Sequence, residues 1–166
     1  SQRSVYPHID VDACSANNVL LCSNMHSDTP SYAAAELTLG VILASYRQIP
    51  KQTASLSNGS WQLGVGRTLR GRTLGLYGYG RIAGAVAQYA HAMGLKVQWW
   101  GSEDGRKRAL ADGQTVPDCR QSFFETSDIV SLHVRLKPDT RGIITGDDLA
   151  HMRPRALLVN TSRSGL

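Results

Sequence analysis

Long apolar runs and targeting signals are both missing from this chain of 166 residues. No stretch reaches the length of a membrane-spanning helix, and the most apolar helical segment, 33–44, is short and contains Glu36. The first residues do not show a basic region followed by an apolar core and a cleavage site. We therefore expect a cytoplasmic protein without a membrane partner.

Cysteine is scarce and poorly placed for a disulfide framework or a metal site. The chain has three cysteines, an odd number, and none of them shows the spacing of metal ligands: Cys14, Cys22 and Cys119. We expect reduced, partly buried thiols and no bound metal.

Clustered positive charge is also lacking, although the net charge is +5 and the isoelectric point is about 9.4. The basic residues are scattered over separate loops, and no aromatic-rich basic strand or recognition helix accompanies them. They include Arg67, Arg70, Arg72, Arg106, Lys107, Arg108, Arg153 and Arg155. We expect no nucleic-acid partner, whereas a small polyanionic ligand would suit this charge.

A glycine-rich turn is the most informative feature that is present. The apolar run Thr73–Tyr77 leads into Gly78-x-Gly80-x-x-Ala83, where a helical pattern starts at once. Gly78 permits a tight turn, Gly80 lets a pyrophosphate approach the backbone, and Ala83 lets the helix pack closely on the strand. The N–H groups at the start of the helix favour phosphate binding. This order predicts a dinucleotide site.

Strands and helices alternate from about residue 72 onward. We predict the strands Thr73–Tyr77, Lys96–Trp100, Thr115–Val116 (weak), Asp128–Val134 and Ala156–Thr161. The predicted helices are Arg81–Met93, Arg106–Ala111, a single turn at Ser122–Thr126, and Asp147–His151. Apolar strands without strict alternation are typical of a parallel sheet that is covered on both faces. The fold class is therefore α/β, with a Rossmann-type doubly wound parallel sheet that is incomplete at its C-terminal side.

The first 71 residues follow a different pattern. Val19–Cys22 is a candidate strand, and a helix begins at Asp28 or Thr29, has Pro30 in its first turn, and ends before Pro50. This helix is apolar nearly all round, so it needs a second partner, either another domain or another subunit. The stretch 55–72 is predicted to be a connecting loop.

Several phrases of this chain together resemble the D-isomer-specific 2-hydroxyacid dehydrogenases, a family that includes phosphoglycerate dehydrogenases and glyoxylate/hydroxypyruvate reductases. The phrases occur in family order over almost the whole chain: Ala35–Leu37, Leu69–Gly75, Gly78–Ile82, Ser127–His133, Thr140–Gly142 and Met152–Arg163. The resemblance implies an oxidoreductase that transfers a hydride between NAD or NADP and a small 2-hydroxy or 2-keto acid. It also implies a homodimer built through the 33–46 helix and the following loop. By the same resemblance, residues 1–27 end the substrate domain, 28–71 form the interdomain helix and loop, and 72–166 form a truncated cofactor-binding domain.

The resemblance also assigns site residues. Arg163, in the Asn-x-x-Arg phrase, is the catalytic arginine that holds the substrate carboxylate and polarises its carbonyl group. The expected cofactor-binding residues are Gly78, Tyr79, Gly80, Arg81, Ile82, Gly101, Ser102, His133, Val134, Arg135, Thr140, Thr161 and Ser162.

Two departures from the family pattern affect the expected cofactor. The family usually has an acid at the end of the second strand for the adenosine ribose, but Gly101 and Ser102 stand here, with Glu103 and Asp104 next. Glu103 could reach the ribose, or Ser102 with Arg106, Lys107 or Arg108 could hold a 2′-phosphate, so NAD and NADP both stay open. Arg135 stands where the family often has proline.

The family's catalytic histidine and its partner carboxylate lie downstream of the Asn-x-x-Arg phrase, and this chain ends shortly after Arg163. The histidines present are not substitutes by motif: His8, His26, His91, His133 and His151. We therefore interpret the chain as an internal fragment that is inactive by itself. Two other functions stay open, a nicotinamide-sensing corepressor-like protein and a methyltransferase that uses S-adenosylmethionine.

Overall fold

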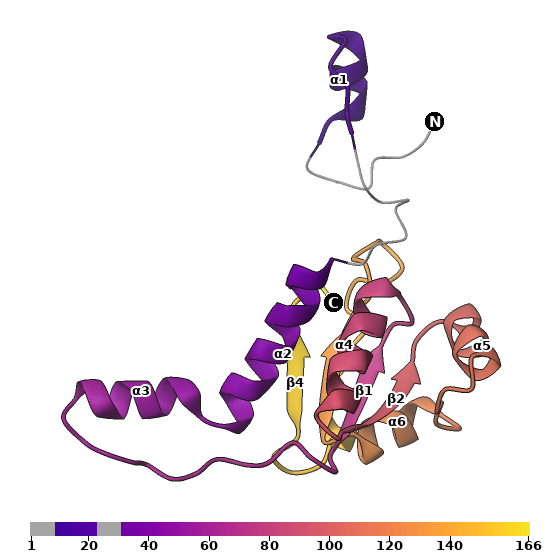
Figure 1. Cartoon of the computed structure of the whole chain (residues 1–166). Helices are drawn as coiled ribbons and strands as arrows, with labels where there is room; N and C mark the ends of the chain where they lie inside the picture. The colour runs from indigo at the N-terminus through magenta and orange to yellow at the C-terminus, as the bar shows by residue number, and fades with distance from the viewer. Residues whose placement is uncertain (1–8, 23–30) are drawn as a thin grey trace.

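A four-stranded parallel sheet forms the centre of the structure, a computed structural model that describes residues 9–22 and 31–166 (Figure 1). The strands are β1 (Thr73–Tyr77), β2 (Lys96–Trp100), β3 (Ile129–Leu132) and β4 (Leu157–Asn160), in the spatial order β2-β1-β3-β4. In this order β2 and β3 lie on opposite sides of β1. The predicted α/β fold with a parallel sheet is confirmed.

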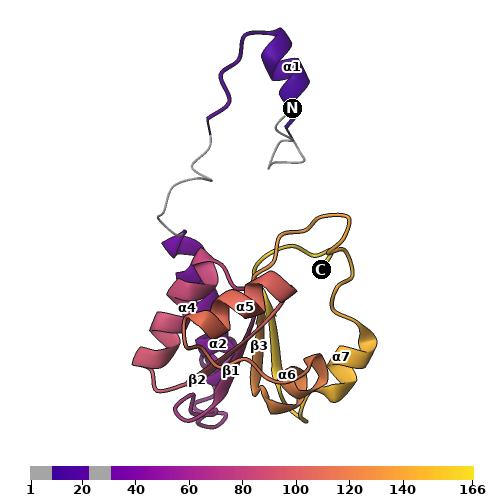
Figure 2. The same ribbon diagram turned by 90° about the vertical axis from the view of Figure 1, so that its right-hand side faces the viewer.

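Helices cover both faces of the sheet, as Figure 2 shows from the side. They are α2 (Tyr32–Tyr46), α4 (Arg81–Ala92), α5 (Glu103–Ala111), α6 (Arg120–Thr126) and α7 (Gly146–His151). Neighbouring strand residues point to opposite cores: Leu76 and Trp99 pack with α4, whereas Tyr77 and Trp100 pack with Phe123 and Phe124 of α6. Because both faces are buried, the strands show the continuous apolar character that the sequence displays.

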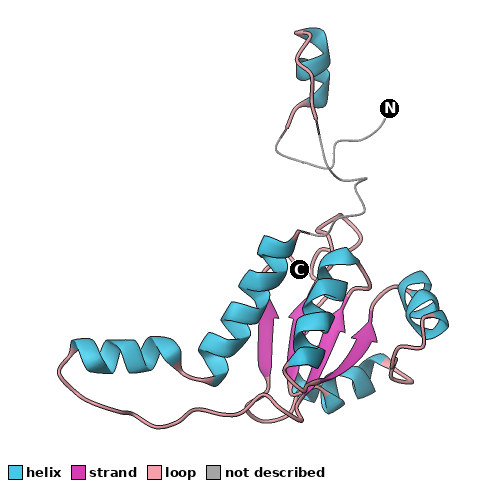
Figure 3. Cartoon of the chain, viewed as in Figure 1, coloured by secondary structure: helices cyan, strands magenta, loops and turns pink. Residues whose placement is uncertain are grey.

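The strands end level with one another along one edge. Tyr77 pairs with Trp100 and with Leu132, and Leu132 pairs with Asn160. Figure 3 shows the four strands as arrows that point the same way. The loops that leave their carboxyl ends therefore lie side by side.

Two predicted strands are wrong. Val19–Cys22 has no strand structure, and its apolar side chains are exposed, Leu20 by 86%. Thr115–Val116 is not a strand either, since one backbone hydrogen bond, from the Trp99 N–H to the Thr115 carbonyl (2.9 Å), links this segment to β2. Pro117 follows at once and has no N–H group to extend a ladder.

A helix that the sequence analysis missed, α3 (Ile49–Ser57), follows α2 after a short turn. Pro50 was expected to end the preceding helix, but it lies in the first turn of α3, where its missing N–H would have had no partner anyway. The predicted loop therefore begins after Ser57. The predicted helix start at residues 28–30 lies outside the described residues.

α2 has one buried and one exposed apolar side. Its buried residues Ala35, Thr38, Ile42 and Tyr46 form one stripe, and the helix packs mainly on α4 and also contacts α3 and β4. Leu37 on the other side is 57% exposed. No helix in the described ranges is long and apolar enough to cross a membrane.

The short helix α1 (Val11–Ala16) has no buried residue. Of the three thiols, Cys14 is half-buried while Cys22 and Cys119 are exposed, so the prediction of partial burial is wrong for the last two. Cys119 is exposed because it stands at the N-cap of α6, just outside the core.

Candidate functional site

The predicted site residues from β1, β2, β3 and β4 gather along the edge formed by the carboxyl ends of the strands. In a doubly wound sheet, ligands bind at this edge, at the point where the chain reverses the direction in which it adds strands. Here that point lies between β1 and β3. The loops after Tyr77 and Leu132 therefore form the two sides of the candidate site.

Gly78 is required by the packing of these loops. Its φ of +120° disfavours side chains, and an added Cβ would lie 2.6 Å from the His133 carbonyl oxygen. The Gly78 N–H donates to the Trp100 carbonyl (2.7 Å), and the His133 N–H donates to the Tyr77 carbonyl (2.8 Å). A Cβ on Gly101 would lie 3.5 Å from the Cα of Gly78. The backbones that follow β1, β2 and β3 thus meet at Gly78.

Gly80 is not required by the protein itself. Its backbone is extended (φ −135°, ψ 175°), and an added Cβ would meet no atom within 4 Å. It is the N-cap of α4 and has no side chain to accept from the N–H groups of the first turn, which begins with Arg81 and Ile82. Space next to these donors fits a pyrophosphate, which the helix dipole also favours.

A cavity of about 410 Å³ opens next to this turn, lined by Tyr79, Gly80, exposed Arg81 and Arg108 among others. Arg108, at the end of α5, donates to the Tyr79 carbonyl (3.1 Å), and the Tyr79 hydroxyl donates to Asp112. Burial and this hydrogen bond raise the pKa of Tyr79 to about 12. The Tyr79 side chain therefore supports the turn from the α5 side, a role for Arg108 and Asp112 that no sequence motif indicated.

His133 lies at the end of β3 with its ring mostly buried. Its Nε2 is 2.9 Å from the Ser131 hydroxyl, and burial lowers its pKa to about 4. The ring is therefore neutral at neutral pH. The loop continues through Val134 and exposed Arg135 to Thr140, whose hydroxyl donates to the Arg135 carbonyl (2.6 Å) and accepts from the Lys137 N–H (2.8 Å). Thr140 thus fixes the shape of this loop.

The Asn-x-x-Arg phrase forms a turn at the end of β4. The Asn160 side chain accepts from the Ser162 N–H (3.0 Å) and donates to the Arg163 carbonyl (2.8 Å). The Ser162 hydroxyl donates to the Leu132 carbonyl (2.9 Å), which ties the turn to β3. Thr161 is anchored to α2, since its hydroxyl lies 2.7 Å from that of Thr38. These contacts explain why asparagine precedes Arg163 and why buried Thr38 stands in an apolar helix.

Arg163 itself is exposed at this edge, and its guanidinium donates to the Ser162 carbonyl (2.9 Å). At the end of β2, Ser102 caps α5 by accepting from the Gly105 N–H (3.2 Å). Glu103 pairs with Lys107 at 2.7 Å on the outer side of α5. The described residues contain no group of three or more histidine, cysteine or acidic side chains that could hold a metal.

Comparison with known proteins identifies the domain. Residues 39–166 match the model of the D-isomer specific 2-hydroxyacid dehydrogenase, NAD binding domain. The chain belongs to this family. It is 35% identical to a D-3-phosphoglycerate dehydrogenase of Methanocaldococcus jannaschii over 96% of this chain and 30% of that protein. It is also 35% identical to a hydroxypyruvate reductase of Thermotoga maritima over 95% of this chain and 50% of that protein.

Solved structures share the fold. A phosphoglycerate oxidoreductase from Vibrio cholerae is 42% identical, with a TM-score of 0.85 over 98% of this chain and 52% of that chain. A putative D-3-phosphoglycerate dehydrogenase from Ralstonia solanacearum is also 42% identical, with a TM-score of 0.82 over 95% of this chain and 49% of that chain. The chain thus spans between 30% and 52% of the length of these relatives.

Proposed function

We propose that this chain is the cofactor-binding part of an oxidoreductase that transfers a hydride between NAD(P) and C2 of a small 2-hydroxy or 2-keto acid. The observation that carries the proposal is Gly80, which the protein's own packing does not require but which opens the start of α4 to a phosphate. The relatives named above, a phosphoglycerate dehydrogenase and a hydroxypyruvate reductase, support the substrate class.

Each residue of the candidate site has a separate task in this proposal. The N–H groups of Arg81 and Ile82, together with the Arg81 guanidinium, hold the pyrophosphate. Thr161 and Ser162 border the nicotinamide, which supplies or accepts the hydride when bound. His133, Val134, Arg135 and Thr140 border the nucleotide from the β3 side. Because His133 is neutral, it adds no charge next to the cofactor.

Arg163 holds the substrate carboxylate and draws charge from the carbonyl oxygen at C2. A planar guanidinium can form two parallel hydrogen bonds to a carboxylate and still donate to a second oxygen. The turn made by Asn160 fixes the backbone of Arg163 next to β3, where the candidate crevice lies. A guanidinium N–H that donates to the carbonyl oxygen at C2 stabilises the negative charge that develops there in the transition state.

We further propose that NADP is preferred over NAD. No carboxylate stands at the position directly after β2, and Glu103 is engaged with Lys107. Ser102 and the basic residues of α5, with Arg106 over the Trp100 ring at 4.3 Å, would face the 2′-phosphate. Comparing kcat/KM for the two cofactors tests this preference. Ser102→Asp should shift the ratio toward NAD, since it places an acid next to the ribose.

The proposed activity is tested with the full-length protein, glyoxylate, hydroxypyruvate and other 2-keto acids, following oxidation of NADPH or NADH. We expect turnover, and we expect Arg163→Gln to lower kcat/KM by about a hundredfold or more, as loss of a charged transition-state donor does. Arg163→Lys should recover only part of this, because an ammonium lacks the planar fork. Cofactor binding without any turnover would instead indicate a nicotinamide-sensing binding protein.

Cytoplasmic location and homodimer formation are proposals as well. The dimer is supported by apolar side chains that α3 and the loop after it expose, among them Trp61 (81% exposed) and Val65 (70%). Figure 1 shows this arm extending away from the sheet. A second copy of the chain would cover such a surface in the usual two-fold arrangement.

A further inference from the structure

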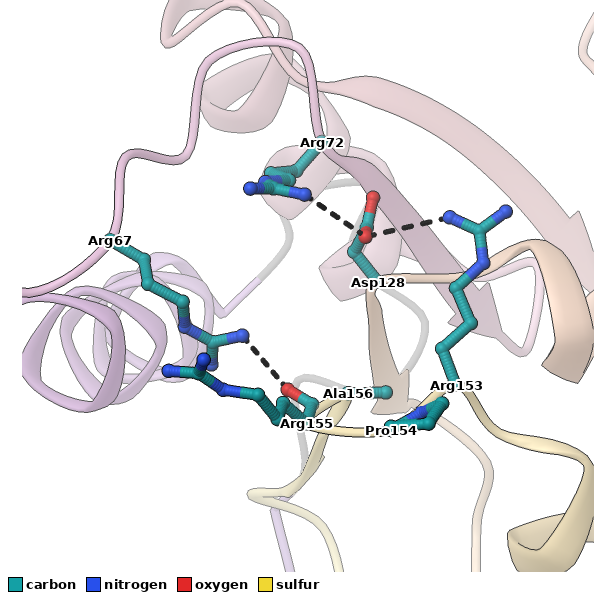
Figure 4. A pocket seen from close by; sticks show the side chains of 7 residues that line it. All are labelled: Arg67, Arg72, Asp128, Arg153, Pro154, Arg155 and Ala156. Atoms are coloured by element: carbon teal, nitrogen blue, oxygen red, sulfur yellow. Dashed lines mark hydrogen bonds and ion pairs between the residues drawn. The ribbon is translucent and has the colours of Figure 1, made fainter.

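A second cavity, of about 430 Å³, lies at the edge of the sheet opposite to the proposed cofactor site. Its lining residues precede the strands: Arg72 comes before β1, Asp128 before β3, and Arg153, Pro154, Arg155 and Ala156 before β4. Arg67 completes the lining from the loop that returns from α3, and Figure 4 shows all seven residues. Because the strands are four or five residues long, about 15 Å separates the two edges. The cavity is therefore separate from the proposed hydride-transfer site.

Four guanidinium groups and a single carboxylate face this cavity. Asp128 is shared between two of them, since its Oδ1 lies 3.6 Å from Arg72 Nη1 and 3.5 Å from Arg153 Nη1. Its other oxygen accepts the Thr73 N–H at 2.9 Å, so Asp128 is held in place by the start of β1. One carboxylate therefore balances only part of the positive charge, and the remainder would attract an anion.

The guanidinium donors are only partly used. Arg67 donates to the Arg155 carbonyl (2.9 Å) and stacks over the Tyr46 ring (4.2 Å), which fixes its position at the mouth of the cavity. Arg153 donates from Nε to the Glu125 carbonyl (2.8 Å), and this leaves its outer nitrogens near the cavity. Within the ranges that the structure describes, the Arg155 side chain has no hydrogen bond or ion pair. Each guanidinium carries five donors, so several stay available to oxygen atoms of a ligand.

Arg155 stands in a backbone conformation that suits glycine better. Its φ is +69°, and a side chain in this region raises the energy of the folded state. The long charged side chain therefore stands at this position at a cost to stability. A change of Arg155 to glycine would therefore have two separate effects: it would raise the stability of the fold and lower the positive charge of the cavity.

We propose that this cavity binds a small polyanion that carries two or more phosphate or carboxylate groups. Planar guanidinium forks recognise these groups by paired, charge-assisted hydrogen bonds. The volume is that of a small-molecule site. The four arginines come from two separate segments of the chain, 67–72 and 153–155, so a ligand with several anionic groups could bridge them where a monovalent ion could not. This proposal does not rest on the proposed activity.

The test uses isothermal titration of the full-length protein with citrate and with pyrophosphate at constant ionic strength, with sodium chloride as the reference. The titration is repeated with NADP in excess, because pyrophosphate also suits the start of α4. We expect binding that persists in the presence of NADP. Arg155→Gly should weaken it about tenfold, the usual effect of losing one charge-assisted hydrogen bond.

The same Arg155→Gly variant should melt at a higher temperature, since glycine accepts a positive φ. A fold defect cannot explain weaker binding by a more stable protein. Asp128→Asn should tighten anion binding, because it removes the competing carboxylate but keeps an oxygen for the Thr73 N–H. Arg70→Gln is the matched control: Arg70 is exposed, lies two residues from Arg72, and does not line the cavity.

Four results would overturn the proposal. The first three are no heat beyond that of chloride, binding that disappears when NADP is present, and equal weakening by Arg155→Gly and Arg70→Gln. If Arg155→Gly changed only self-association, the cavity would serve acidic side chains of a second copy, and the proposal would also be wrong.

Discussion

At the scale of single residues, the two glycines of the turn after β1 are needed for different reasons, one for the fold and the other for the proposed cofactor. Gly78 has a positive φ and no room for a Cβ, whereas Gly80 has an ordinary backbone and open space beside it. We expect Gly78→Ala to cost more than about 2 kcal/mol of unfolding free energy, because strain and a backbone clash add. Gly80→Ala should change it by less than about 1 kcal/mol but weaken NAD(P) binding at least tenfold. Urea unfolding and cofactor titration measure the two effects.

Gly40→Ala is the control for this pair. An added Cβ at Gly40 meets no atom within 4 Å, and this exposed residue lies inside α2, away from the cavity next to Gly80. This variant should keep its cofactor affinity and gain up to about 1 kcal/mol from better helix propensity. Wild-type affinity in Gly80→Ala would mean that no pyrophosphate approaches this turn.

The buried ring of His133 predicts a loss of stability in mild acid. Burial lowers its pKa from 6.5 to about 4, so between these values the unfolded chain binds a proton that the folded chain does not. Stability therefore is complete above pH 6.5 and falls as the pH drops toward 4, by about 2 kcal/mol between pH 7 and pH 5. His133→Gln should remove this part of the pH dependence in urea unfolding. If the unfolding free energies of the wild type and of His133→Gln changed with pH in parallel, the pKa of His133 would not be lowered by folding.

At the scale of elements, one arginine joins α6, α7 and β1. Arg120 donates to both oxygens of Asp148 at 2.6 Å, to the Tyr77 hydroxyl at 2.8 Å, and to the Ile143 carbonyl. Although burial by itself raises the pKa of Asp148, hydrogen bonds from Arg120 and Thr145 outweigh it and hold that pKa below its ordinary value.

Removal of Arg120 should therefore destabilise the β3–β4 half of the domain. Arg120→Ala leaves the carboxylate of Asp148, which is 6% exposed, without its ion partner. We expect a cost of about 2–3 kcal/mol, below the value for a fully buried pair because Arg120 is 37% exposed. Thermal and urea unfolding measure it. Adding Asp148→Asn should recover part of the loss, since the capping interaction with Thr145 survives. If the double variant were no more stable than Arg120→Ala, the unpaired charge of Asp148 would not be the cause of the loss.

The strongly patterned elements could be predicted from sequence, and the weakly patterned ones could not. β1, β2 and α4 match their predicted ranges to within a residue, because two buried faces and a glycine turn leave clear signals. α3 was missed because Pro50 signals both the end of one helix and the start of the next. Val19–Cys22 has apolar character without strand structure, and Thr115–Val116 is linked to β2 by one backbone hydrogen bond without forming a strand. Strand pairing depends on tertiary contacts that no local pattern shows.

At the scale of the whole molecule, the candidate site could be predicted because parallel topology brings the ends of all strands to one edge. The motif residues around Gly78, His133 and Arg163 did fall there. Two of their supports could not be predicted, because Thr38 contacts Thr161 and Arg108 contacts Tyr79 across many residues of sequence. The cavity at the opposite edge was equally hidden, because its arginines look like scattered surface charge until the strand starts align them.

The whole-molecule prediction concerns the arm formed by α3 and the residues up to Arg67. This arm holds its own shape, since Gln52 donates to the Gly64 carbonyl (2.7 Å) and accepts from the Leu63 N–H (3.2 Å). It nevertheless exposes Trp61, Leu63 and Val65, which no other part of the described residues covers, and a second copy of the chain is the cover that we propose. We expect a dimer at micromolar concentration in analytical ultracentrifugation.

Leu63→Ser tests this interface against a matched control. Leu63 on the arm and Leu110 on α5 are 61% and 58% exposed, so either change to serine has a similar local effect. Removing a leucine from an interface costs about 2 kcal/mol. A two-fold interface loses both copies of the side chain, which raises the dimer dissociation constant roughly a thousandfold. Leu63→Ser should therefore shift the sedimentation profile toward monomer, while Leu110→Ser should not. A wild-type protein that sediments as a monomer, or an equal shift in both variants, would mean that the arm is covered by something other than a second copy.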